Sequence, residues 1–326
     1  MHTGKLVPIT GFLILSAMVL LLFGFTVYEA WILHSVGGVI VLGVLFGLLL
    51  ELKDECKGVT CPSASGLLTR IALFNFIAVL GGAILTYALS VNLDLGAVIA
   101  SSLVGVIAAL VVPAYGVPLY CGAFVGMTSA QLLVTHGELA IAGAVAGVVY
   151  LLTTDVFRGF GGKLGTIAFT GSVITGLGLA REFLITPTPE WDVLWIIIAC
   201  SIIATVSTFY LNVKLGHGPV LASSIVGLTG GLILPALYPE IGSTLAVMAV
   251  CASFAGMSGE QHFPCLTQMV LVGAITGAIF IYSMPLLGGA GGKLGTIAFG
   301  SVLAVKGYVG AMERVRKKEL GVIRKT

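Results

Sequence analysis

GGKLGTIAF, residues 161–169, recurs letter for letter at residues 291–299. Each copy sets one lysine, Lys163 or Lys293, among glycines and apolar residues, in a chain with few charges. Nine identical residues in an otherwise diverged sequence indicate an internal duplication. The lysine-bearing glycine turns are therefore the first candidates for a functional site.

The duplication extends beyond these nine residues. An offset of 130 residues aligns Cys121 with Cys251 and Phe124 with Phe254, and continues without a gap into the repeated stretch. Upstream, an offset of 122 aligns 91–113 with 213–235, so the second copy carries an insertion of 130 − 122 = 8 residues. The sequence predicts four parts: two N-terminal helices with a cytoplasmic loop (1–70), two five-helix units (71–192 and 193–313), and a basic cytoplasmic tail (314–326).

The composition is that of an integral membrane protein. Hydrophobic residues make up 58% of the 326 residues and charged residues 9%, whereas soluble domains carry about a quarter charged residues. The predicted class is an all-α polytopic membrane protein. The expected partners are the lipid bilayer and a small solute or ion, and a homo-oligomer stays open. The net charge of +2 gives no reason to expect nucleic acid.

Apolar stretches near the ~20 residues that cross a bilayer predict twelve spans. Several are shorter, which leaves broken or re-entrant helices open. The basic tail predicts a cytoplasmic C-terminus, and an even number of crossings places the N-terminus on the same side of a plasma membrane. The predicted spans are 9–28, 32–50, 71–90, 96–113, 118–134, 139–154, 164–180, 193–211, 219–235, 242–258, 266–284 and 294–312.

An odd number of spans in each unit predicts that the two units are inverted. The plan resembles, as an architecture, that of transporters built from two inverted repeats, in which the solute site lies at the repeat interface. Inversion would place Lys163 at the cytoplasmic mouth of a pathway and Lys293 at the outer mouth. Lys293 then departs from the positive-inside pattern because symmetry fixes its position.

The repeated turn has the features of an anion site. Glycines before a helix expose backbone N–H groups, and the helix start carries a partial positive charge of about half a unit, to which a lysine adds. The alternative is that the glycines serve close helix packing and the lysines reach the interface. The candidate pathway residues here are Gly161, Gly162, Lys163, Thr166, Gly291, Gly292, Lys293 and Thr296.

Two further paired elements are candidates. Glycine-methionine pairs followed by a hydroxyl residue predict a backbone irregularity that could present carbonyl groups to a solute, or an ordinary helix whose hydroxyl binds its own backbone. Paired serines could line a path or pack helices, and two glutamines follow in register. These residues are Gly126, Met127, Thr128, Gly256, Met257, Ser258, Gln131, Gln261, Ser101, Ser102, Ser223 and Ser224.

The absence of certain residue types from the predicted spans excludes some classes of membrane protein. No Asp or Glu falls at the middle of a predicted span, which favours a channel or facilitator over a coupled pump. No nucleophile and base form a constellation, so no enzyme is expected. Cys56 and Cys61 lack further ligands, so neither a metal nor a cofactor is expected.

The sequence thus predicts a channel or transporter for a small anionic or polar solute. One alternative is a cation channel or carrier that uses backbone carbonyls at broken helices. The other alternative is a membrane subunit or scaffold that transports nothing.

Overall fold

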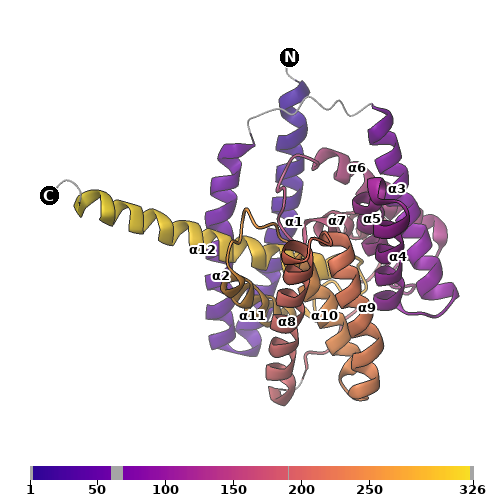
Figure 1. Ribbon diagram of the computed structural model, residues 1–326. Helices are drawn as coiled ribbons and strands as arrows, with labels where there is room; N and C mark the ends of the chain where they lie inside the picture. The colour runs from indigo at the N-terminus through magenta and orange to yellow at the C-terminus, as the bar shows by residue number, and fades with distance from the viewer. Residues whose placement is uncertain (1–2, 60–68, 190, 324–326) are drawn as a thin grey trace.

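The computed structural model describes residues 3–59, 69–189 and 191–323, and Cys61 and the last three residues of the predicted tail lie outside them. Within these ranges a helix overlaps each of the twelve predicted spans, in some cases only in part (Figure 1). The helices are α1 (Thr3–Leu33), α2 (Ser35–Gly58), α3 (Arg70–Tyr87), α4 (Ala97–Val111), α5 (Gly116–Val125), α6 (His136–Leu152), α7 (Lys163–Gly178), α8 (Leu194–Phe209), α9 (Pro219–Leu237), α10 (Gly242–Gly256), α11 (Leu266–Ser283) and α12 (Lys293–Ile323).

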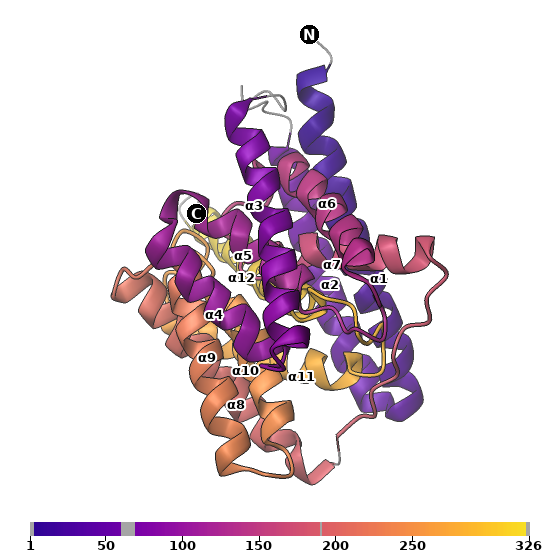
Figure 2. The ribbon, with the colours of Figure 1, turned by 90° about the vertical axis from the view of Figure 1, so that its right-hand side faces the viewer.

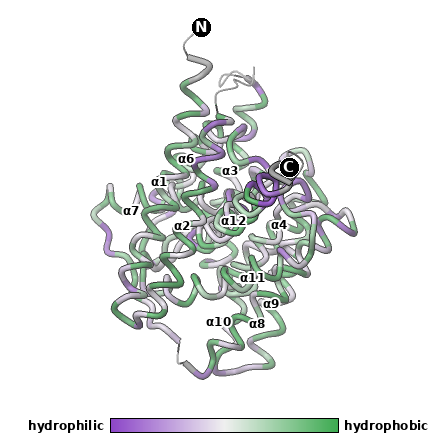
Figure 3. The backbone as a smooth tube through the Cα atoms, turned by 90° about the vertical axis from the view of Figure 1, so that its left-hand side faces the viewer, coloured by the Kyte–Doolittle hydropathy of each residue, from purple (hydrophilic) through white to green (hydrophobic). Residues whose placement is uncertain are grey.

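Among the described residues, seven helical stretches are long and apolar enough to cross a membrane. They correspond, in whole or in large part, to α1, α2, α3, α8, α9, α11 and α12. Large apolar side chains such as Trp195 and Ile185 are 77% and 85% exposed. In Figure 3 hydrophobic residues, coloured green, recur along all the long helices. This is the surface of an integral membrane protein. The count of twelve full crossings is not confirmed, because α4, α5, α6, α7 and α10 are shorter.

The clearest departure from the predicted spans is α5. Its ten residues extend about 15 Å, half of the ~30 Å hydrocarbon core, although residues 118–134 were predicted to be one span. The Thr128 hydroxyl donates to the Val125 carbonyl at 2.6 Å, and residues 126–135 continue as turns. A hydropathy pattern does not detect this break, because the residues beyond it remain mostly apolar.

Local structures recur in the two halves of the chain. A π-helical turn follows α3 at Ala88–Asn92 and follows α8 at Tyr210–Lys214, and 210 − 88 = 122. Gly96 precedes α4 with φ +74° and Gly218 precedes α9 with φ +79°, again 122 residues apart. The offset found in the sequence therefore also relates unusual backbone conformations.

The helices form two groups with α1 and α2 at their side (Figures 1 and 2). Helix α5 packs on α3, and α10 packs on α8 and α9, while α4 and α9 join the two groups. Helix α12 runs from the centre past α2, where the Tyr308 hydroxyl donates to the Gly43 carbonyl. The C-terminal ends of α2 and α12 extend past the predicted spans, so α2 includes a carboxylate, Glu51, that is 6% exposed.

Candidate functional site

The two copies of the repeated stretch touch one another at the starts of α7 and α12. Gly162 and Gly292 have φ of +82° and +85°, a conformation that favours glycine. The place of a Cβ at Gly162 is taken by backbone of Gly295 and Phe299, and the place at Gly292 by backbone of Gly165 and Phe169. Contacts thus pair early residues of one helix with later residues of the other.

Gly165 and Gly295 face each other where these helices cross, with no room for a Cβ on either. We expect Gly165→Ala to lower the free energy of unfolding by about 1–3 kcal/mol, because the methyl group must push two backbones apart. Thermal unfolding in detergent measures this. Gly178→Ala, in the same helix with open space around it, is the matched control, and equal stability of the two variants would contradict the close crossing.

Each glycine turn is held by the loop that follows α5 or α10 in the other copy. The Gly161 amide donates to the Ser258 hydroxyl at 3.1 Å, and the Gly291 amide donates to the Thr128 hydroxyl at 3.2 Å. Backbone bonds repeat the exchange: Gly259 N–H to Gly159 carbonyl at 2.8 Å, and Ser129 N–H to Gly289 carbonyl at 2.9 Å. The Gly-Met elements and the lysine turns are therefore one assembly.

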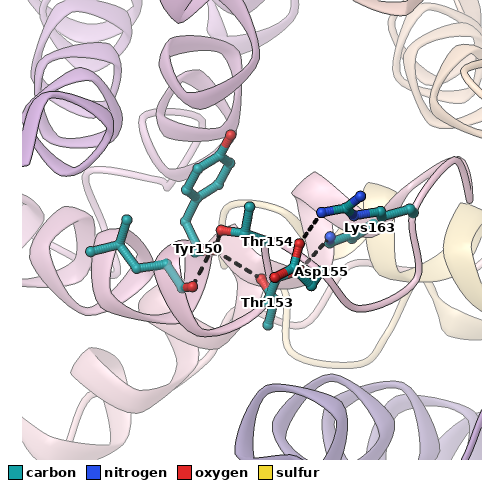
Figure 4. Close-up of polar contacts among 7 residues, drawn as sticks. Tyr150, Thr153, Thr154, Asp155 and Lys163 are labelled. Carbon is teal, nitrogen blue, oxygen red and sulfur yellow. Dashed lines mark hydrogen bonds and ion pairs between the residues drawn. The ribbon is translucent and has the colours of Figure 1, made fainter. Parts of the chain in front are cut away.

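Each repeated lysine caps the end of the helix before it. The Lys163 ammonium donates to the Thr153 carbonyl, the C-cap of α6, at 2.6 Å (Figure 4). The Lys293 ammonium donates to the carbonyls of Met284, the C-cap of α11, at 3.0 Å, and of Leu286. A cation there is favourable because the helix C-terminus carries partial negative charge. The lysines have a structural role whatever else they do.

Both lysines also line cavities, of about 240 Å³ for Lys163 and 220 Å³ for Lys293. Each cavity combines the lysine of one copy with the methionine of the other copy's Gly-Met element: Met257 with Lys163, and Met127 with Lys293. Several other wall residues also correspond at an offset of 130. The paired wall residues are Val117 and Val247, Tyr150 and Phe280, Leu164 and Leu294, and Ile167 and Ile297.

An aromatic contact lies where the two cavities share a wall. Phe254 lines both cavities and Phe124 lines the first. Their ring centroids are 4.3 Å apart, and Tyr120 packs on Phe124 at the same separation. All three side chains are 1% exposed. Phe254 is thus common to both linings, and Phe124 and Tyr120 pack beside it.

The charges that line the cavities are positive. Lys163 and Arg158 line the first cavity and Lys293 the second, and neither lining includes Asp or Glu. Arg158 forms an ion pair with Asp155 (Figure 4), and position 288, its counterpart at offset 130, is a glycine. Each cavity therefore has one lysine with no carboxylate partner among the described residues.

Several predicted ligand groups are already hydrogen-bonded within the protein. The hydroxyls of Thr166 and Thr296 are buried and donate to the carbonyls of Gly162 at 3.5 Å and Gly292 at 3.4 Å. The amides of Gly161 and Gly291 bind the other copy's hydroxyls. These groups were predicted from the sequence as donors available to a solute. In the structure they form hydrogen bonds that stabilise the glycine turns.

The paired serines lie apart from both cavities, at the contact of α4 with α9. Oγ of Ser224 occupies the space beside Gly105, and Oγ of Ser102 the space beside Gly227. Ser101 donates to the Val98 carbonyl at 3.2 Å, and Ser223 bonds the Ser253 hydroxyl at 2.8 Å. These serines favour the packing interpretation. Gln131 and Gln261 are exposed in the loops after α5 and α10 and line neither cavity.

Sequence reasoning missed the aromatic side chains of the site. Phe124 and Phe254 were visible only as members of the duplication, and Tyr150 aligns with Phe280 at the same offset. A paired aromatic residue at corresponding depth was the available signal. Apolar residues give no other sign in a chain that is 58% hydrophobic.

Comparisons with protein-family models, with curated proteins and with solved structures find no match to this chain. The geometry of the site carries the functional argument.

Proposed function

We propose that this protein is a membrane permeation protein for small anions, built from two inverted five-helix units, 71–192 and 193–313. The observation that carries the proposal is the pair of corresponding cavities, each with an unpaired lysine and no lining carboxylate. Positive charge in a cleft with apolar walls raises the local concentration of anions. The pathway passes from one lysine cavity to the other through the Phe124–Phe254 contact.

The contact between α7 and α12 supports inversion. Gly162 contacts residues 295–299, while residues 165–169 contact Gly292. Residue numbers therefore increase along one helix as they decrease along the other, so the two helix starts are antiparallel. Antiparallel helix starts are what a two-fold axis in the membrane plane requires of equivalent elements. The short helices then complete their crossings through irregular backbone that lines a cavity.

Contacts between loops support twelve crossings with both termini in the cytoplasm. Five contacts, named at the end of this paragraph, each join two loops or helix ends. In the proposed topology both members of each contact lie on the same side of the membrane. Arg181, an exception to the positive-inside pattern, is paired with Glu138 at 2.6 Å. The pairs are Asn92 and His136, Arg181 and Glu138, and Leu184 and Gly288 outside, with Lys214 and Glu260, and Asp54 and Arg314, inside.

Inversion predicts opposite accessibility of two equivalent residues. Gln131 and Gln261 are 130 positions apart, and both are exposed. In a background with the native cysteines replaced by serine, we expect Gln131→Cys in intact cells to react with an impermeant maleimide. Gln261→Cys should react only after the membrane is permeabilised. Labelling of both variants from the same side would refute inversion.

Flux into liposomes containing the purified full chain tests permeation. We expect nitrate and chloride to enter faster than into protein-free liposomes, while potassium and glycerol enter at the protein-free rate. Potassium flux that does not depend on either lysine would instead favour conduction by backbone carbonyls at the broken helices. Failure of every solute to exceed the protein-free rate would favour a non-transporting subunit.

A further inference from the structure

The two cavities provide few hydrogen-bond donors for a ligand. Lys163 has three N–H donors, and one of them binds the Thr153 carbonyl. Lys293 uses two, on Met284 and Leu286. The hydroxyls of Thr153 and Thr154, which line the first cavity, donate to carbonyls of α6. About two lysine donors are left in the first cavity, beside the Tyr150 hydroxyl and the guanidinium of Arg158, which is paired with Asp155. One lysine donor is left in the second cavity, beside the Thr186 hydroxyl.

The rest of the lining is largely apolar. In the first cavity Val117, Leu164 and Ile167 face the same space as Phe254 and Met257. In the second, Val247, Leu294 and Ile297 take the equivalent places. Such walls cannot replace the water that surrounds an anion in solution.

An anion that enters either cavity exchanges most of its hydration for one unpaired ammonium group and at most a few neighbouring donors. Burying a charge without enough hydrogen bonds is costly, and the cost is greatest for ions that hold water most strongly, such as sulfate and phosphate. A single unpaired lysine balances one negative charge and leaves a divalent anion half compensated. The cost of dehydration and the incomplete charge balance both disfavour strongly hydrated, divalent anions.

From these donors and walls, and resting on the proposed function, we propose that the cavities select weakly hydrated monovalent anions. Thiocyanate and nitrate should pass more readily than chloride, and sulfate should be excluded. The selectivity arises from the shortage of donors and not from a dedicated oxyanion cradle. This is the opposite of what free glycine amides and threonine hydroxyls would have produced.

Relative permeability in liposomes containing the full chain tests the proposal. The probes are potassium salts of thiocyanate, nitrate, chloride and sulfate at equal ionic strength, with protein-free liposomes subtracted because thiocyanate crosses lipid slowly on its own. We expect thiocyanate and nitrate to exceed chloride by about tenfold, and sulfate to stay at the protein-free rate. Sulfate flux equal to nitrate flux, with both above background, would overturn the selectivity and leave anion permeation standing. Absence of flux for all four anions would overturn both.

A second pair of variants tests the role of the donors directly. Val117→Thr and Val247→Thr add one hydroxyl to each cavity at nearly constant shape, and we expect the double variant to raise chloride permeability relative to thiocyanate about fivefold, because a hydrogen bond to an ion favours the more strongly hydrated anion. Val148→Thr, on the outer face of α6 and 48% exposed, is the matched control. An unchanged ratio in the double variant, with flux still present, would contradict selection by donor shortage.

Discussion

Replacing both Lys163 and Lys293 by glutamine is expected to reduce anion flux into liposomes by about a hundredfold, and either single substitution by about tenfold. Each lysine is the one cation without a carboxylate partner in its cavity, and a focused positive potential raises anion association by 10–10³-fold. In the proposed pathway an anion is attracted by both lysines, and because their electrostatic free energies add, their effects on flux should multiply.

The lysines also cap helices, so loss of flux alone does not separate charge from folding. Lys163→Arg with Lys293→Arg keeps the charge and should retain most of the flux, while thermal unfolding of all variants reports stability. Lys214→Gln removes a lysine that is paired with Glu260 outside the cavities, and should leave flux unchanged. If the arginine and glutamine variants lost flux equally at equal stability, charge would not be the cause.

Replacing Phe254 by alanine, alone or with Phe124→Ala, is expected to raise flux about tenfold or more and to let larger anions such as gluconate pass. Phe254 lines both cavities and packs on Phe124 at 4.3 Å, so truncation removes the wall between the cavities. The half-buried lysines and the other walls of each cavity remain in place. Flux of nitrate and gluconate, measured side by side, gives the result.

Truncation of a buried phenylalanine costs about 3–5 kcal/mol, so stability must be matched. Phe23→Ala removes a fully buried ring of α1 that lines neither cavity, and should lower stability without raising flux. Phe254→Leu keeps part of the ring volume and should give an intermediate flux. Gluconate exclusion in the folded double alanine variant would show that the rings do not separate the two sides.

The membrane class and the order of the helices could be predicted because the apolar composition and the duplication are visible in the sequence itself. The contact between the glycines of the two repeated stretches was not predicted, because the sequence placed Lys163 and Lys293 at opposite mouths of a pathway. The length of α5 did not follow, because the Thr128 hydroxyl ends that helix through one hydrogen bond and leaves hydropathy unchanged.

The roles of individual polar groups were harder to predict. Thr166 was a candidate ligand, yet its hydroxyl binds its own helix. Glu51 is buried because α2 continues eight residues past the predicted span end at residue 50, to Gly58. The role of such a polar side chain depends on which partner lies within about 3 Å of it. The order of residues along the sequence does not give that distance.

The exchange of hydrogen bonds between the copies bears on how such a chain could have arisen. Ser258 supports the turn of Lys163, and Thr128 supports the turn of Lys293, so neither half completes its own lysine turn. An ancestral polypeptide with a single unit would have needed a second molecule, inverted in the membrane under the proposed topology, to supply the missing loop. Fusion of two units into one chain would make that encounter intramolecular and leave positions 158 and 288 free to differ, as Arg158 and Gly288 do.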